Sequence, residues 1–117
     1  MTSPPGSRAA SGPANSDAIL AAMANPTRRL LLTALGATGQ ATATELARGL
    51  PISRQAVAKH LAVLADAGLV SRSRPGRDVR LRVDAAGLAA TAEWLAALAA
   101  DWDVRLAAIR RIAEAGA

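Results

Sequence analysis

A cluster of polar side chains opens the segment 53–67, and its residue types suit hydrogen bonding to a nucleic acid. At about 100° per residue on a helix, Gln55 and Lys59 lie roughly opposite the apolar positions, and Arg54 lies in the first turn. Those apolar positions, which must face the core, are Val57, Leu61 and Leu64. Arg and Lys can pair with guanine edges and Gln with adenine, while Ser53 can offer its hydroxyl or backbone N–H to a phosphate. The pattern predicts a base-reading helix over residues 53–67.

A solvated polar face, common on any surface helix, is the alternative interpretation of these side chains. His60 lies at the flank of the apolar stripe, so packing and phosphate contact are both open for it. A metal-ligand role is not expected for His60, because it is the only His in a chain without Cys.

A second basic cluster surrounds the turn dipeptide Pro75-Gly76. The strand on its C-terminal side, 79–83, alternates apolar residues with Arg, which predicts a hairpin with a basic outer face. We expect Arg74 and Arg77, nearest the tip, to contact the phosphate backbone or the minor groove. The alternative is an edge strand that charge protects from aggregation, but five arginines exceed that need: Arg72, Arg74, Arg77, Arg80 and Arg82.

Two further arginines, Arg28 and Arg29, open an earlier helix. We expect Arg28, and Arg29 beside it, to contact phosphate, and an ion pair with an acid of the last helix is an equally open interpretation for both.

The elements that must position these residues follow from periodicity and capping signals. A helix is expected from Ser16 or Asp17 to Ala24, and Asn25-Pro26 starts another that runs to about Leu35 and is ended by Gly36 and Gly39. Thr42 or Thr44 opens a third helix that ends near Gly49, Ser53 caps the fourth, and Gly68 ends it. The wing covers 70–83, and a long helix runs from about 84 or 85 to 113. Residues 1–15, rich in Pro, Ser, Gly and Ala, are expected to be a disordered tail before one domain over 16–117.

The charge distribution supports a partner of negative charge. The net charge is +5, and ten Lys and Arg face only three acids between residues 28 and 82. The absence of Cys excludes disulfides and zinc fingers. No nucleophile–base pair, phosphate-binding Gly loop, metal cluster or membrane-spanning run is visible, so we expect a cytoplasmic protein that is not an enzyme and needs no cofactor.

A heptad-like apolar seam follows the last helix. Leu88, Leu95, Trp102 and Ile109 recur at intervals of seven. Leu98, Leu106 and Ile112 lie alongside, and the first helix adds Ile19, Leu20 and Met23. The seam predicts a homodimer through the terminal helices, which would place two recognition helices on the half-sites of a palindrome in double-stranded DNA. Packing of this helix on its own domain is the alternative.

Helix, tight turn, helix and basic hairpin together predict a mainly helical winged helix-turn-helix fold. The stretches NPTRRLLLTAL, TELARGLPISRQAVAKHLAVLADAGLV and PGRDVRLRV resemble the ArsR/SmtB-type family of bacterial repressors, over roughly residues 19–112. The resemblance implies a homodimer that binds operator DNA and represses transcription, often of its own operon, until an inducer weakens binding.

The chain departs from the metal-sensing members of that family. Their Cys-x-Cys site on the third helix is replaced here by the stretch from Ala43 to Ala47, and the last helix has no His. The sequence thus resembles the branch that does not sense metal, and any inducer is unidentified. The alternative function is a helix-turn-helix module that contacts proteins or a membrane surface without reading a DNA sequence.

Overall fold

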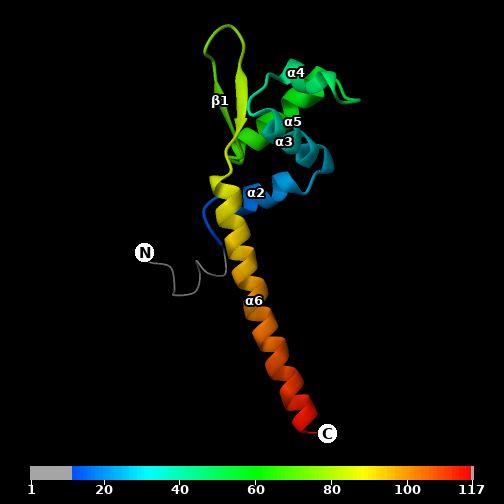
Figure 1. The fold of residues 1–117 in the computed structure, drawn as a ribbon, viewed down its shortest axis with the longest axis vertical. Coiled ribbons are helices and arrows are strands. Elements are labelled where there is room, and N and C mark those ends of the chain that lie inside the picture. The colour runs from blue at the N-terminus through cyan, green and yellow to red at the C-terminus, as the bar shows by residue number, and fades with distance from the viewer. Residues whose placement is uncertain (1–11, 117) are drawn as a thin grey trace.

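The computed structural model describes residues 12–116, which form a head and a long helical extension (Figure 1). The elements in chain order are α2 (Ser16–Met23), α3 (Pro26–Thr38), α4 (Ala43–Arg48), α5 (Arg54–Asp66), β1 (Val70–Ser73), β2 (Arg80–Val83) and α6 (Ala86–Ala115). The head contains every element except most of α6, which leaves it as a single rod (Figure 1). A mainly helical fold with one antiparallel hairpin confirms the predicted architecture.

Three helices of the head begin at side-chain caps. Asn25, Thr42 and Ser53 each accept the backbone N–H three residues later at 3.1 Å. Thr42, rather than Thr44, is therefore the cap of α4. These local signals place α3, α4 and α5 close to the predicted positions.

The end of α3 differs from the prediction. Gly36 was expected to help end the helix, but α3 continues through it to Thr38. Glycine destabilises a helix interior by only about 1 kcal/mol relative to alanine, which the packing of the flanking Leu35 can offset. The helix ends at Gly39, whose φ of 87° lies in the left-handed region that favours glycine.

The core of the head is built where α3, α5 and the hairpin meet. Its fully buried members include Leu31 and Leu35 of α3, Val57 and Leu64 of α5, and Leu69 before β1. The predicted inward face of α5 is thus confirmed. Leu61, its third member, is also buried.

The hairpin is joined to the start of α4 by a backbone bridge that the sequence did not reveal. β1 pairs with β2 in the register Val70↔Val83 to Ser73↔Arg80. Ala41 then pairs with Leu81 from the other side, with N–O distances of 3.1 and 2.9 Å. The wing is therefore fixed to the helix-turn-helix at its base.

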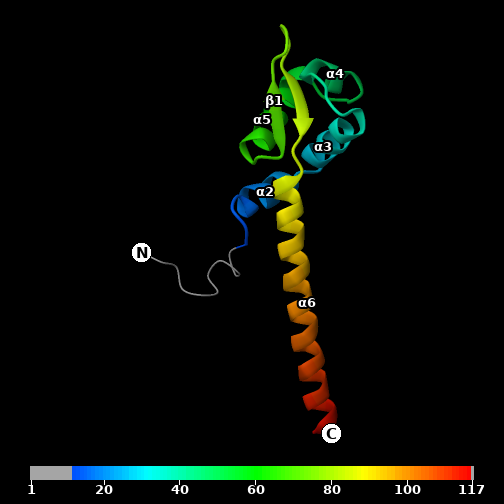
Figure 2. The same cartoon turned by 60° about the vertical axis from the view of Figure 1, so that its left-hand side comes forward.

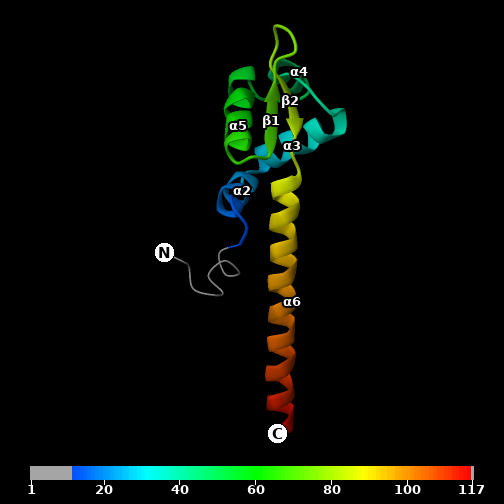
Figure 3. The same ribbon diagram turned by 90° about the vertical axis from the view of Figure 1, so that its left-hand side faces the viewer.

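The first part of α6 packs on α2. A Cβ on Gly87 would lie 2.9 Å from Cδ1 of Ile19, so glycine permits the close approach of the two helices. Thr91 is buried, and its hydroxyl donates to the carbonyl oxygen of Gly87 at 2.8 Å. Beyond this part, no other element of the described chain lies beside α6 (Figures 2 and 3). The helix ends at Ala115, two residues later than predicted.

The expected tail, 1–15, is only partly described, because residues 1–11 lie outside the described part of the chain. The backbone of Gly12 lies against the Trp94 ring, since an added Cβ would be 2.8 Å from the indole carbon Cδ2. Ser16 donates its N–H to the Pro13 carbonyl oxygen at 3.1 Å. No helix within residues 12–116 has the length and apolar character needed to cross a membrane.

Candidate nucleic-acid interface

A groove of about 460 Å³ opens between the wing tip, α4 and the first turn of α5. Four cations line this basic groove: Arg48 from α4, Arg54 from α5, and Arg74 and Arg77 from the wing. Two acids, Glu45 and Asp78, also line it, so cations outnumber acids. The loop of the wing projects at the end of the head that is farthest from α6 (Figures 1 and 3). The arrangement can hold a polyanion across the two helices and the wing.

The exposed face of α5 carries the residues proposed to read bases. Arg54, Gln55 and Lys59 are exposed, on the side of the helix away from the core. The Ser53 hydroxyl accepts the N–H of Ala56, which leaves its own O–H to donate to another group. Because the cap fixes the first turn of α5, it also fixes the start of the exposed face.

His60 occupies the flank of α5, where it is half-buried. It has no hydrogen bond or ion pair to another described residue. Within residues 12–116, no three His, Cys, Asp or Glu side chains are grouped so that they could hold a metal ion.

The wing tip is organised by its own side chains. Nε of Arg74 donates to the carbonyl oxygen of Arg77 at 3.1 Å, across the turn. Residues 71–79 are all exposed. The bond directs Arg74 along the loop and fixes part of the loop's shape.

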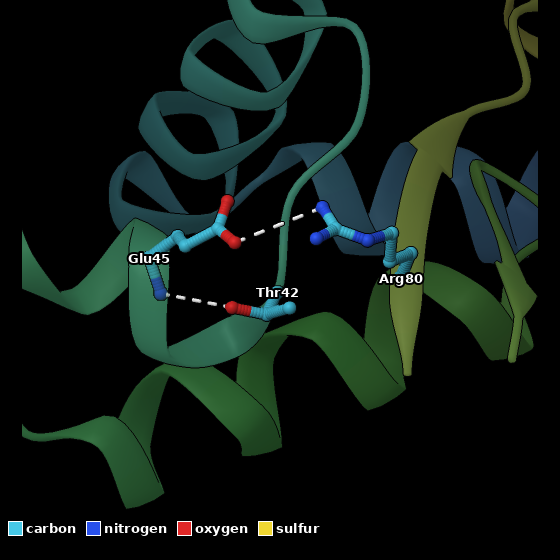
Figure 4. A network of polar contacts seen from close by, with 3 residues as sticks. All are labelled: Thr42, Glu45 and Arg80. Atoms are coloured by element: carbon cyan, nitrogen blue, oxygen red, sulfur yellow. Dashed lines mark hydrogen bonds and ion pairs between the residues drawn. The ribbon is translucent and has the colours of Figure 1, made fainter. Parts of the chain in front are cut away.

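Sequence reasoning missed two contributors near this groove. Arg48 lines the groove from the last turn of α4, and Glu45 forms an ion pair with Arg80 of β2 at 3.7 Å (Figure 4). Arg48 could have been found by placing α4 on a helical wheel beside the turn. Glu45 and Arg80 are 35 positions apart, so no local spacing connects them.

Arg28 has a different environment from either predicted one. Its Nε donates to the Ala22 carbonyl oxygen at 2.8 Å and its Nη2 to that of Ala21 at 3.2 Å. Arg29 donates to the Met23 carbonyl oxygen at 2.6 Å. Both arginines thus satisfy carbonyls at the end of α2, where cations also favour the helix dipole. Neither forms an ion pair with an acid of α6, and Arg28 does not line the basic groove.

The predicted dimerisation residues divide into two groups. Ile19 is 1% exposed inside the head, and Met23 and Leu88 are half-buried against the same core. Ile19 was therefore wrongly assigned to an intermolecular seam, because its side chain is already covered within one chain. Leu20 is 39% exposed at the edge of α2.

The remaining members form an exposed stripe on α6. The α6 apolar face, as we call it, consists of Leu95, Leu98, Trp102, Leu106 and Ile109. Exposure rises from 40% at Leu95 to 60% at Ile109. The Arg105 guanidinium lies 5.7 Å from the Trp102 ring centroid and also pairs with Asp101 at 3.2 Å.

The helices, the turn and the basic wing define a winged helix-turn-helix domain, and comparisons with known proteins agree. Residues 23–72 match a family of helix-turn-helix domains. The HTH-type transcriptional regulator YuzN of Bacillus subtilis is 46% identical over 69 residues, which cover 54% of this chain and 75% of that protein. The HTH-type transcriptional regulator Rv2034 of Mycobacterium tuberculosis is 45% identical over 69 residues, covering 59% of this chain and 64%, just under two thirds, of that protein.

A solved structure extends the similarity beyond the helix-turn-helix. An ArsR-like transcriptional regulator from Rhodococcus sp. RHA1 has a TM-score of 0.77 and 44% identity, over 85% of this chain and 92% of that one. The chain belongs to the ArsR family of transcriptional regulators and carries its helix-turn-helix DNA-binding domain. Proteins of this family are regulators rather than enzymes.

Proposed function

We propose that the protein is a homodimeric repressor that binds a palindromic operator through α5 and the wing. The observation that carries this proposal is the basic groove, in which Arg54 of α5 and Arg74 and Arg77 of the wing face one space. A helix in the major groove brings its first turn to base edges, and a wing beside it meets the adjacent backbone. One DNA duplex can therefore contact both parts of the groove.

Each contact has a proposed role. Arg54, Gln55 and Lys59 read base edges, while Ser53 and His60 contact phosphates at either side of them. Arg74 and Arg77 contact the backbone or the minor groove, and Arg48 adds a phosphate contact. Arg28 is left out of the interface, because its guanidinium is already hydrogen-bonded to α2.

The homodimer is supported by the α6 apolar face. Its exposed Leu, Ile and Trp side chains form a stripe on α6, which beyond its first part has no neighbouring element within the described chain. Pairing with a second copy would bury the stripe and relate two α5 helices by a two-fold axis. A palindromic site matches that symmetry.

The signal and the location complete the proposal. We propose that the protein represses its own operon and acts in the cytoplasm. The third-helix cysteines of metal sensors are absent from Ala43 to Ala47, so we propose that the protein responds to an unidentified inducer other than a metal. Zinc added at a few equivalents would then leave operator affinity unchanged. A marked loss of affinity on zinc addition would contradict this assignment.

The experiment that tests the DNA-binding role is selection of bound duplexes from a random pool by the full chain. We expect enrichment of one palindrome and its presence in the promoter of the protein's own gene. Specific affinity of about 10⁻⁸ M or better at physiological salt is expected for such a site. Uniformly weak binding, with no enriched sequence, would instead support an interaction module that does not read DNA.

A further inference from the structure

The segment that starts α4 is attached to β2 at two neighbouring places. The backbone of Ala41 pairs with that of Leu81 through two hydrogen bonds. Four residues later, Oε1 of Glu45 lies 3.7 Å from Nη1 of Arg80, the residue before Leu81 (Figure 4). A backbone contact and a side-chain contact therefore connect the same short stretches.

The backbone of Glu45 is held in place from the helix side as well. Thr42 accepts the Glu45 backbone N–H at 3.1 Å, which fixes the first turn of α4 (Figure 4). A carboxylate in that turn also suits the positive end of the helix dipole. The ion pair is partly open to water, with side-chain exposures of 43% for Glu45 and 36% for Arg80.

The two contacts constrain the direction of the wing. A backbone bridge at one residue pair lets the strand rotate about that point, whereas a second contact on the neighbouring residue opposes the rotation. Because α4 packs on α5, the direction of β2 sets where Arg74 and Arg77 stand relative to Arg54.

The charge of Glu45 is otherwise unfavourable here. Its carboxylate lines a groove that attracts phosphates, so it must repel DNA. Apart from its favourable place at the dipole of α4, a role of Glu45 in DNA binding therefore runs through its contact with Arg80 rather than through contact with the ligand.

We infer that Glu45 is a positioning residue that acts through Arg80 to hold the wing at a fixed distance from α5. In this way it controls how well the protein discriminates its operator from other DNA. The inference rests on the proposed DNA-binding function.

The test compares Glu45→Gln with Asp78→Asn in the full chain. Asp78 lines the same groove, and it forms no ion pair with another residue in the described part of the chain, so both variants remove one negative charge and only one breaks a contact. Dissociation constants are measured for the selected operator and for a scrambled duplex of equal length. We expect Asp78→Asn to tighten both equally, whereas Glu45→Gln lowers the ratio of specific to non-specific affinity about threefold or more, within the range that an exposed ion pair sustains.

A second set of variants asks whether Arg80 carries the effect. Arg80→Gln is compared with Arg82→Gln, which removes the same charge from an exposed position of β2. We expect the ratio to fall only with Arg80→Gln, and the double variant Glu45→Gln/Arg80→Gln to be no worse than either single variant. Unchanged melting temperatures would show that the loss is one of positioning and not of folding.

The possible failures are distinguishable. If the unmodified protein shows no preference for any duplex, the proposed function fails. If it prefers its operator but Glu45→Gln behaves like Asp78→Asn, or the two single effects simply add in the double variant, the positioning role of Glu45 is wrong.

Discussion

The head and the outer part of α6 differ in how far their large apolar side chains are exposed. Leu31, Leu35 and Leu64 are fully buried by other residues of the same chain. On α6, Trp102 is 53% exposed and Ile109 60% exposed. Large apolar side chains are thus covered in one region and open to water in the other.

This difference separates the apolar side chains that one chain can bury by itself from those that only a second molecule could cover. Burying one large apolar side chain stabilises a protein by about 1.5 to 3 kcal/mol, so the head gains its stability internally. The side chains of the α6 apolar face would give a similar stabilisation if another surface buried them. Binding geometry within a head is therefore encoded in one chain, and in the proposed homodimer the spacing between two heads would depend on α6.

The largest expected effect is the loss of stability when the core of the head is disrupted. Leu35→Ala removes a fully buried side chain from the core and should lower the free energy of unfolding by about 2 to 5 kcal/mol. Val104→Ala, at a position 67% exposed on α6 and off the heptad stripe, should change it by about 0.5 kcal/mol or less. Urea denaturation measures both, and similar losses would remove the distinction between the two regions.

The second largest effect is expected on the proposed dimer. Trp102→Glu places a charge in the middle of the α6 apolar face and should weaken the dimer by about 2 kcal/mol or more, roughly thirtyfold, as for a central interface residue. Val104→Glu adds the same charge at an exposed position that lies off the heptad stripe, so it is the matched control. Sedimentation equilibrium gives the dissociation constants. A dimer that tolerates Trp102→Glu but not Val104→Glu would place the interface on another side of α6.

A smaller effect is expected at the reading face of the head. Arg54→Ala should cost about 1 to 3 kcal/mol on the operator and relax base preference at one position of each half-site. The free energy of unfolding of this variant should be unchanged, because Arg54 is exposed. Repeating the random-pool selection with the variant measures the preference, and an unaltered consensus would exclude Arg54 from base reading.

The smallest expected effect distinguishes Arg77 from Arg28 by how DNA binding of each variant depends on salt concentration. Arg77→Gln should weaken binding to every duplex and reduce the slope of log K against log[salt] by about 0.9, because one phosphate contact is lost. Arg28→Gln should leave the slope unchanged and lower the stability of the head, because two hydrogen bonds to α2 are lost. Titrations at several salt concentrations distinguish them, and the reverse pattern would exchange their assigned roles.

Local chemistry made much of the head predictable from sequence. Asn25 and Ser53 cap their helices as expected, because a cap requires only a residue and the N–H three positions later. The inward face of α5 followed from the helical period in the same way.

What the sequence could not reveal depends on distance along the chain. Nothing near Ala41 predicts its bridge to Leu81, and nothing near Glu45 points to Arg80. Ile19 has the periodicity of a seam residue, yet the approach of α6 at Gly87 encloses it. Periodicity identifies an apolar face, but only the fold determines whether that face meets the same chain or another one.

The backbone of Gly12 against the Trp94 ring has a spectroscopic consequence. The chain has two tryptophans, and they report on different events. Trp94 is half-buried beneath Gly12, whereas Trp102 stands on the α6 apolar face. Dimerisation through that face would move the emission of Trp102 to shorter wavelength and leave Trp94 largely unchanged. Replacing either tryptophan by phenylalanine would leave the other as the only tryptophan, so its fluorescence would report on its own site without an added label.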